Sequence, residues 1–224
     1  MTAAFKKLIH IVADFLFPIR CLGCNRDGNL LCPDCETLLT ESVTEQTNGR
    51  IEAVFPYRFR LVRELIWHLK YRQIAQTAEI FAPYLRDKIL SLIADDWWLA
   101  NYLKTRPIIL IPVPMSRKRR RQKNFNQAEV LAQAVANGTD YLLFMPNLVA
   151  KTRHTKTQVA CQSRTERKQN LQNAFLVTKP EVIRGQVCIV IDDVTTTGAT
   201  MTEIIKKLKA AGARTVFGLA VAHD

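Results

Sequence analysis

The alternation of apolar and polar residues along the chain predicts a parallel β-sheet. Residues 108–113 and 187–191 are short apolar runs rich in β-branched side chains, which is typical of strands buried on both faces. Residues 214–223 give another strand. Because strands of this type need helices on both faces of their sheet, the pattern predicts an α/β fold.

Helical periodicity follows the strands. Residues 127–138 fit a helix after the first strand, and a second helix begins near residue 199 and can end at Gly212. The apolar face of that second helix has the i, i+3, i+4 and i+7 spacing, at Met201, Ile204, Ile205 and Leu208. Residues 192–198 must therefore form a tight connection at the carboxyl end of a parallel strand, where α/β folds place ligands.

The connection "DDVTTTG" combines two carboxylates with groups that suit a phosphate. Hydroxyl groups come from Thr195, Thr196, Thr197 and, in the first turn of the helix, Thr200. Gly198 lets the backbone approach a ligand closely, and the start of the helix favours an anion. Asp192 and Asp193 would repel a phosphate placed directly against them, but they can accept hydrogen bonds from vicinal hydroxyls. A ribose 5-phosphate satisfies both groups, because it carries a phosphate and a diol.

The stretch "VCIVIDDVTTTGAT" resembles the 5-phosphoribosyl-1-pyrophosphate (PRPP) motif of type I phosphoribosyltransferases. That motif is a hydrophobic run, two acids, an apolar residue, any residue, and then T-T-G-x-[ST], and every position fits. The alternative is a solvated strand-to-helix turn capped by two acids. A P-loop and a Rossmann fingerprint need glycine patterns that do not occur in this sequence.

Length and charge widen the set of partners without choosing among them. The 224 residues allow one domain with an appendage or two small ones, and 32 Lys and Arg against 20 Asp and Glu give a net charge of +12. Such a charge favours nucleotides, nucleic acid or a membrane surface. No apolar stretch reaches the roughly 18 residues of a membrane span. Residues 5–16 have an apolar stripe that favours docking on the protein over membrane binding, and no signal-peptide cleavage site follows, so we expect a cytoplasmic protein.

Four of the six cysteines form two C-x-x-C pairs in "CLGCNRDGNLLCPDC". They are Cys21, Cys24, Cys32 and Cys35. This spacing is typical of a tetrahedral zinc site, and four thiolates leave the zinc no open position, which predicts a structural role. Disulfides and a redox pair are the alternatives. We expect residues 1–48 to form an N-terminal helix and zinc-binding module, and residues 49–224 to form a phosphoribosyltransferase-like domain.

Two basic segments accompany the predicted site. Residues 117–123 hold six positive charges, and residues 151–168 hold six more. Such runs are usually solvated loops or contacts for nucleic acid. The first run follows the carboxyl end of a strand, at the same edge of the sheet as Asp192. We therefore expect it to bind the pyrophosphate that leaves PRPP.

Further motifs extend the resemblance over nearly the whole chain to the ComF family, which is linked to DNA uptake in natural competence. They are the four-cysteine knuckle, "LIWHLKYR", "PVPMSRKRRRQKNFNQA", "TRHTKTQ" with "RTERKQNLQNAF", and "VIDDVTTTGAT". The resemblance implies a pyrophosphate loop at Ser116, Arg117 and Lys118, and a mobile flap with Thr155, Gln158, Arg164 and Arg167. It also implies Asp192 and Asp193 as catalytic acids, and PRPP contacts at Thr195, Thr196, Thr197, Gly198, Ala199 and Thr200.

Two places depart from the family pattern. Asn124 stands where the family's R-G-F-N-Q has glycine, so this asparagine must adopt a positive φ, which Asn tolerates better than most residues. The dipeptide "CQ" replaces the usual apolar residue near position 161. Both departures fall in segments that the resemblance places around the ligand, so either could alter loop closure.

The resemblance implies a phosphoribosyltransferase that moves the phosphoribosyl group of PRPP to an unidentified nitrogen acceptor with Mg²⁺. Residues 50–101 would then supply the part of the site that selects the acceptor. The competing hypothesis is a protein that binds nucleotide or single-stranded DNA in DNA uptake without catalysis, with competence proteins as further partners. In that case the arginine-rich segments contact phosphates, and Phe125 and Phe175 stack on bases.

Overall fold

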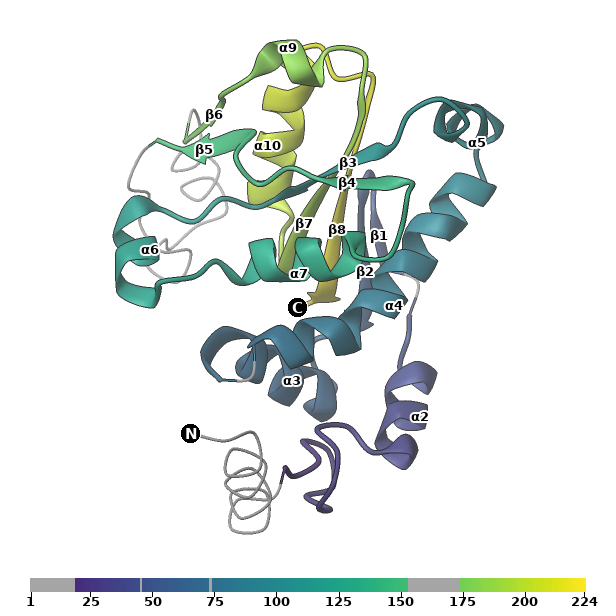
Figure 1. The fold of residues 1–224 in the computed structure, drawn as a ribbon, viewed down its shortest axis with the longest axis vertical. Helices are drawn as coiled ribbons and strands as arrows, with labels where there is room; N and C mark the ends of the chain where they lie inside the picture. Colours follow the sequence, from purple (N-terminus) through teal and green to yellow (C-terminus); the bar gives the residue numbers. More distant parts are fainter. Residues whose placement is uncertain (1–18, 45, 73, 153–173) are drawn as a thin grey trace, which may run out of the picture.

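The computed structural model describes residues 19–44, 46–72, 74–152 and 174–224. Its centre is a six-stranded sheet with the strand order β1-β2-β8-β7-β3-β4 (Figure 1). All neighbouring strands in this sheet are parallel except β1 and β2. The predicted α/β fold with a parallel sheet is therefore confirmed.

The strands follow the apolar runs of the sequence. Their bounds are β1 Gln46–Asn48, β2 Ile51–Pro56, β3 Ile108–Pro112, β4 Leu142–Phe144, β7 Val187–Thr195 and β8 Thr215–His223. A separate antiparallel pair consists of β5 (Val149–Lys151) and β6 (Phe175–Val177). Every residue of β3 is buried, because both faces of the sheet are covered.

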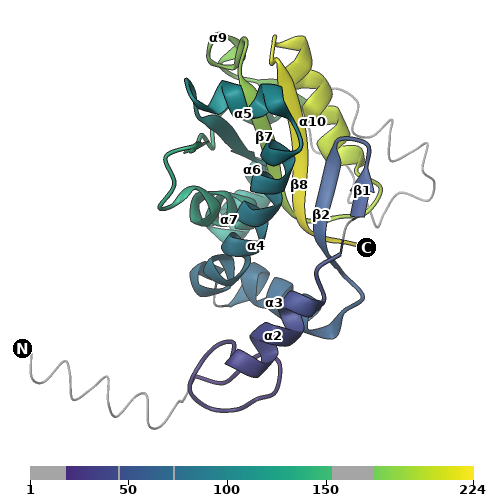
Figure 2. The same cartoon turned by 90° about the vertical axis from the view of Figure 1, so that its right-hand side faces the viewer.

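Helices cover both faces of the sheet. On one face α7 (Gln127–Ala136) packs against β3 and β7, and α4 (Ile74–Ala94) packs against α7, β2 and β8. The short α5 (Trp97–Leu103) follows α4. On the other face α10 (Ala199–Ala210) packs against β7, β8 and β6 (Figure 2). The short α9 (Pro180–Ile183) precedes β7.

Two helices lie beyond the carboxyl ends of the parallel strands. They are α2 (Pro33–Glu41) and α3 (Arg60–Tyr71), and the C terminus of the chain, at the end of β8, points toward them (Figures 1 and 2). α6 (Arg117–Lys123) follows β3 in the chain. Helices α2, α3 and α6 therefore lie toward the edge of the sheet at which ligands of α/β folds bind.

The acids of the PRPP-like motif lie on a strand and not in a loop. β7 continues past residue 191 and ends at Thr195, because its neighbour β8 also continues and pairs with it up to His223. The prediction that this strand ends before Asp192 is therefore wrong. The connection between β7 and α10 is reduced to residues 196–198, and both acids are held within the hydrogen-bonded sheet.

The basic run at residues 117–123 is helix α6, where the sequence predicted a loop. The hydroxyl of Ser116 accepts a hydrogen bond from the backbone N–H of Arg119 at 3.4 Å and so caps the start of the helix. Asn124 ends the helix with a φ of 59°, so the expected positive φ at this asparagine is confirmed.

Two predictions fall outside the described residues. They concern the amphipathic segment at residues 5–16 and the flap residues Thr155, Gln158, Arg164 and Arg167. Within the described ranges, none of the helices has the length and apolarity that a membrane crossing requires.

Candidate functional site

Asp192 and Asp193 lie near the carboxyl end of β7, between β3 and β8. Neighbouring residues of a strand point to opposite faces, so the two carboxylates have different surroundings. Asp193 is 5% exposed, and its Oδ2 lies 3.1 Å from the Nζ of Lys70. Its Oδ1 accepts the N–H of Val194 at 2.7 Å. Asp192 is more exposed, and its Oδ1 accepts the N–H of Asp193 at 2.9 Å.

The charges on the two acids are balanced unequally. Burial and the charge of Asp193 raise the pKa of Asp192 well above its ordinary value, although a backbone hydrogen bond and the charge of Lys70 lower it. Burial lowers the pKa of Lys70, but attraction to Asp193 and a hydrogen bond with it outweigh burial, so this pKa is raised. The negative charge of Asp193 is therefore balanced by Lys70. The charged form of Asp192 would be stabilised by a ligand that brings hydroxyl donors or a positive charge.

Lys70 is a site residue to which the sequence alone assigned no role. It lies in the last turn of α3, and the buried residues Leu65, Ile66 and Leu69 fix that end of the helix in the core. A lysine in the last turn of a helix is already explained by the helix dipole. Its contact with Asp193 could not be predicted, because that contact depends on where α3 packs. Only its place in the motif "LIWHLKYR" marked this segment in advance.

The connection from β7 to α10 has the form of an anion-binding turn. Gly198 has a φ of 70°, and a Cβ at this position would lie 2.8 Å from the Cδ1 of Ile51. The backbone N–H groups of Thr196, Thr197 and Gly198 donate to no acceptor among the described residues. Of the predicted PRPP contacts, Thr195 ends β7, residues 196–198 form the turn, and Ala199 and Thr200 begin α10. These N–H groups and the helix start can bind one anion together.

Asn126 ties the segment that contains α6 to the sheet. This buried side chain donates from Nδ2 to the carbonyl of Val113 at 3.0 Å, and its Oδ1 accepts the N–H of Ala128 at 3.2 Å. Val113 in turn donates its N–H to the carbonyl of Ile191 on β7 at 2.9 Å. The segment between β3 and α7 is thereby held beside the strand that carries the acids.

The predicted pyrophosphate loop is the start of α6. Ser116 is its N-cap, and Arg117 and Lys118 are its first two residues. β3, which precedes α6, is the direct neighbour of β7. Arg120 differs from the rest of the basic run, because its Nη1 and Nη2 lie 2.9 and 3.1 Å from the two carboxylate oxygens of Glu129. We therefore assign Arg120 a structural role, a distinction that six adjacent charges in a sequence do not reveal.

Lys151, at the end of β5, is a further basic residue near the acids. Burial and the charge of Arg119 lower its pKa, while the charge of Asp192 raises it. The three charged groups are therefore close enough to act on one another. β5 and β6 are the strands on either side of residues 153–173, so Lys151 stands next to the segment that contains the predicted flap.

Phe175 does not offer a ring for stacking. It is 3% exposed, lies in the core between β6 and α10, and has the Nζ of Lys151 5.6 Å from its ring centre. The hypothesis that Phe125 and Phe175 together stack on bases is therefore wrong for Phe175. Its place in the short β5–β6 pair, which packs on α10, explains its burial.

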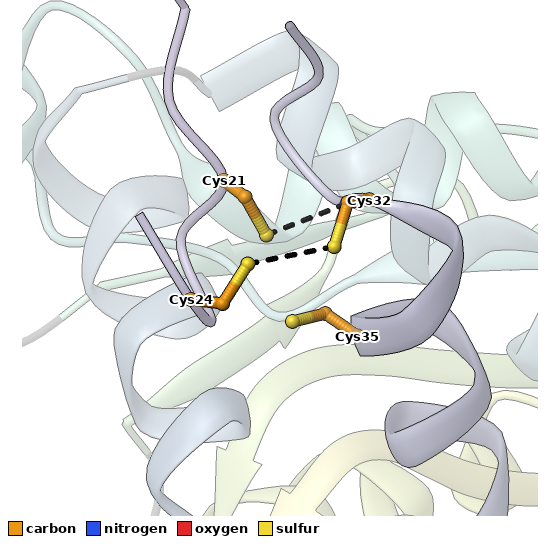
Figure 3. A group of neighbouring side chains, drawn as sticks. All are labelled: Cys21, Cys24, Cys32 and Cys35. Atoms are coloured by element: carbon orange, nitrogen blue, oxygen red, sulfur yellow. Dashed lines mark hydrogen bonds between the residues drawn. The ribbon is translucent and has the colours of Figure 1, made fainter. Parts of the chain in front are cut away.

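The four cysteines of the two C-x-x-C pairs form one cluster (Figure 3). Their Sγ atoms all lie within 4.8 Å of one another, and those of Cys24 and Cys32 are 3.6 Å apart. Tetrahedral Zn–S bonds of about 2.3 Å place the sulfurs about 3.8 Å apart. Cys21, Cys24, Cys32 and Cys35 therefore have the number, the chemistry and the spacing to hold a metal ion such as zinc.

The ionisation of the thiols also favours a cation in the cluster. Burial would raise the pKa of Cys21, but hydrogen bonds from neighbouring backbone N–H groups, including that of Cys32 at 3.4 Å, lower it to about 6. Burial and hydrogen bonds with the other thiols raise the pKa of Cys35. Four adjacent thiols cannot all ionise without a compensating charge, and zinc would supply it.

Gly23 packs the cysteine cluster against α3. A Cβ at this position would lie 2.5 Å from the Sγ of Cys35 and 3.3 Å from the Cδ1 of Leu61. The Nη2 of Arg60 donates to the carbonyl of Gly23 at 3.3 Å. The knuckle is thus joined directly to the helix that carries Lys70.

The sheet, the acid pair and the threonine turn define a phosphoribosyltransferase-type domain, and a model of the phosphoribosyl transferase domain family matches residues 111–224. Competence protein F of Haemophilus influenzae is 37% identical over 137 residues, which are 59% of this chain and 58% of that relative. DNA utilization protein YhgH of Escherichia coli K12 is 30% identical over 205 residues, which are 88% of this chain and 85% of that relative. The chain belongs to the ComF family.

A more distant relative and a solved structure extend the comparison. Competence protein ComFC of Bacillus subtilis is 25% identical over 183 residues, which are 81% of this chain and 68% of that relative. A hypoxanthine phosphoribosyl transferase of Trypanosoma cruzi superposes with a TM-score of 0.41 at 9% identity, covering 66% of this chain and 65% of that one.

Proposed function

We propose that this protein binds PRPP with Mg²⁺ at the carboxyl ends of β3 and β7 and transfers its phosphoribosyl group to a nitrogen acceptor. The observation that carries the proposal is the unequal acid pair. Asp193 is balanced by Lys70, whereas Asp192 has a raised pKa and, among the described residues, no ion-pair partner. A diol that approaches with a cation supplies what Asp192 lacks.

In this proposal each part of PRPP has its own contacts. The turn at residues 196–198 binds the 5-phosphate through its backbone N–H groups, with the threonine hydroxyls beside them. Asp192 and Asp193 accept hydrogen bonds from the ribose hydroxyls. Asp192 would hold the Mg²⁺ that enters with the substrate, and the ion would supply positive charge to offset that of the pyrophosphate.

The basic residues take the leaving group. Ser116, Arg117 and Lys118 stand one strand away from the acids, and Lys151 is close enough to Arg119 and Asp192 for their charges to shift its pKa. The bond from C1 to the pyrophosphate oxygen breaks, and the acceptor nitrogen bonds to C1 and releases its proton. The products are the N-phosphoribosyl compound, pyrophosphate and a proton. Carboxylates on one side and cations on the other stabilise the charges that separate in this step.

The remaining parts have supporting roles in the proposal. The flap with Thr155, Gln158, Arg164 and Arg167 closes over the site and excludes water, which would otherwise hydrolyse the sugar. The cysteine cluster holds one structural zinc. Residues 1–48 form the N-terminal helix and zinc module and residues 49–224 the catalytic domain, with the boundary in the turn between β1 and β2.

The names of the relatives, Competence protein F and DNA utilization protein, support a role in DNA uptake. Free thiols at Cys21, Cys24, Cys32 and Cys35 need a reducing compartment to bind zinc, which supports a cytoplasmic location.

Thermal unfolding with PRPP and Mg²⁺ tests the proposal. A ligand at about 100 times its dissociation constant adds about 2.7 kcal/mol to the free energy of unfolding. For a chain of this size that raises Tm by about 5 to 11 °C. The double variant Asp192→Asn with Asp193→Asn should lose most of the rise, because amides offer the diol no anionic acceptors. Ribose 5-phosphate should give a smaller rise than PRPP, since it lacks the pyrophosphate that α6 is proposed to bind.

Two outcomes would contradict different parts of the proposal. No rise in Tm for the wild type would overturn the ligand assignment. A rise without pyrophosphate release, across a panel of bases and amines, would overturn the transfer step and favour a PRPP-binding protein without turnover.

A further inference from the structure

The ammonium group of Lys70 acts on both acids of the site. Its Nζ lies 3.1 Å from Oδ2 of Asp193, and the charges of Asp193 and Asp192 both raise the pKa of Lys70. The two carboxyl groups are themselves close together, since a hydrogen bond between these side chains contributes to the raised pKa of Asp192. One cation from α3 therefore stands beside two neighbouring anions of β7.

Three of the four carboxylate oxygens have a partner in the ligand-free protein. Asp193 uses Oδ2 for Lys70 at 3.1 Å and Oδ1 for the N–H of Val194 at 2.7 Å. Asp192 uses Oδ1 for the N–H of Asp193 at 2.9 Å, and its Oδ2 accepts no hydrogen bond from an N–H or hydroxyl group of the described residues. A metal ion that arrives alone would therefore meet one available oxygen with an ammonium group nearby.

An acid pair without this lysine would attract divalent metal ions. Carboxylate oxygens suit Mg²⁺ and Mn²⁺, and two adjacent carboxylates offer several of them. An ion bound there without substrate would occupy the oxygens that the ribose hydroxyls of PRPP need. One oxygen is a poor site for Mg²⁺ by itself, because this ion requires nearly octahedral coordination and gives up its water reluctantly.

We propose that Lys70 excludes divalent metal ions from the acid pair of the ligand-free protein, so that Mg²⁺ enters only together with PRPP. The second half of this inference rests on the proposed function. PRPP brings pyrophosphate oxygens as further ligands, and a Mg²⁺ site of this kind needs only one or two carboxylates from the protein. Lys70 is thus a positioning residue, which keeps Asp192 and Asp193 available for the substrate.

Uptake of Mn²⁺ by the ligand-free protein tests the exclusion, because electron paramagnetic resonance measures the free ion directly. Protein with zinc in its cysteine cluster is used throughout. Lys70→Met removes the charge at nearly the same side-chain length. This variant should bind one Mn²⁺ at least about 10-fold more tightly than the wild type, since an ammonium group strongly repels a divalent ion a few ångströms away. Lys70→Arg keeps the charge and should behave like the wild type.

Lys88→Met is the matched control for the loss of a buried ion pair. Lys88 lies 3.2 Å from Glu52, its side chain is 19% exposed against 25% for Lys70, and no second acid is adjacent to Glu52 in the sequence. Lys88→Met should lose stability but should not gain Mn²⁺ binding. Adding Asp192→Asn to Lys70→Met should abolish the uptake, which would assign the ion to the acid pair.

Three results would overturn the exclusion. They are Mn²⁺ uptake by the wild type that Asp192→Asn abolishes, equal affinities of Lys70→Met and Lys70→Arg, and no uptake by folded Lys70→Met. If Lys70→Met does not fold, Lys70→Gln replaces it in the same comparison, because glutamine can still donate a hydrogen bond to Asp193.

Thermal unfolding of the wild type separates this inference from the proposed function. Mg²⁺ alone should leave Tm unchanged, whereas PRPP with Mg²⁺ should raise it. A rise with Mg²⁺ alone that Asp192→Asn removes would overturn the exclusion by Lys70. No rise with PRPP and Mg²⁺ would instead contradict the proposed function, and the Mn²⁺ measurements, which contain no PRPP, would still decide whether Lys70 keeps metal ions away from the acids.

Discussion

Asp192 and Asp193 are adjacent in sequence and chemically identical, but the structure gives them opposite effects on stability. Asp193 forms an ion pair with Lys70 at 3.1 Å, and both partners are mostly buried. Asp192 has a pKa that burial and its neighbour raise. An acid with a raised pKa binds its proton more tightly in the folded state, so its contribution to stability falls as the pH rises above the ordinary range of a carboxyl.

We therefore expect opposite shifts from two isosteric substitutions in the ligand-free protein. Asp192→Asn should raise Tm at pH 7 by about 2 to 4 °C, equivalent to about 1 kcal/mol, because it removes an uncompensated charge. The gain should shrink as the pH falls through the raised pKa of Asp192 and vanish near about 4, where the carboxyl is protonated in the unfolded chain as well. Asp193→Asn should lower the free energy of unfolding by about 1–2 kcal/mol, after allowance for the exposed part of Lys70, and so lower Tm, because it leaves that lysine without its anion.

Calorimetry of both variants between pH 4 and pH 8 checks this pair of predictions. Destabilisation by both substitutions at every pH would show that Asp192 is balanced by groups outside the described residues. Stabilisation by both would show that the ion pair of Lys70 adds nothing.

At the level of elements, the arginines of α6 differ in whether an acidic residue pairs with them. Arg120 is held by Glu129 through two hydrogen bonds, whereas Arg119 and Arg121 are exposed and pair with no acid among the described residues. Their effects on a polyanion should differ accordingly.

Replacing Arg119 and Arg121 together by Ala should lower the slope of log Kd against log salt for oligo(dT) by about 1.4, since each phosphate contact on a single strand contributes about 0.7. Arg120→Ala is the matched control and should leave the slope unchanged while lowering Tm slightly, because a surface ion pair contributes at most about 1 kcal/mol. An unchanged slope in the double variant would remove α6 from nucleic-acid binding and leave it for pyrophosphate.

Comparison of elements also shows why parts of the site were predictable. The core of β7 and the helix α10 followed from local pattern, because burial on both faces and a helical stripe are visible in sequence. The extension of β7 to Thr195 depended on the length of its partner β8, and the packing of Phe175 on the position of the β5–β6 pair. The contact between Lys70 and Asp193 joins residues far apart in the chain, so no local pattern contains it.

At the level of the whole molecule, the cysteine cluster and the sheet share one continuous core. Cys21, Cys32 and Cys35 pack in the same cluster as Leu65 of α3 and Ile189 of β7. The module around the cysteines is too small to bury much apolar surface by itself, so its stability should depend on the metal. Loss of the metal should therefore affect α3 as well as the knuckle.

Protein purified without added zinc should contain one zinc per chain, which contributes on the order of 10 kcal/mol to the folding of the module. Cys24→Ser should lose the metal and show a smaller rise in Tm with PRPP, because Lys70 lies on the helix that the knuckle supports. Cys161→Ser, which alters a cysteine outside the two C-x-x-C pairs of the sequence, should keep the metal. Elemental analysis and thermal unfolding provide the two measurements, and a zinc-free wild type with an ordered knuckle would contradict the expectation.

Gly23 limits how this protein can vary. The obstacle at this position is space and not backbone angle, because a Cβ would lie 2.5 Å from the Sγ of Cys35 and the φ of Gly23 is not among the positive values found in the described residues. Even alanine would press on the sulfur of Cys35, which belongs to the proposed metal site. We therefore expect position 23 to tolerate only glycine. A directed-evolution library built on this chain should leave this codon unmutated.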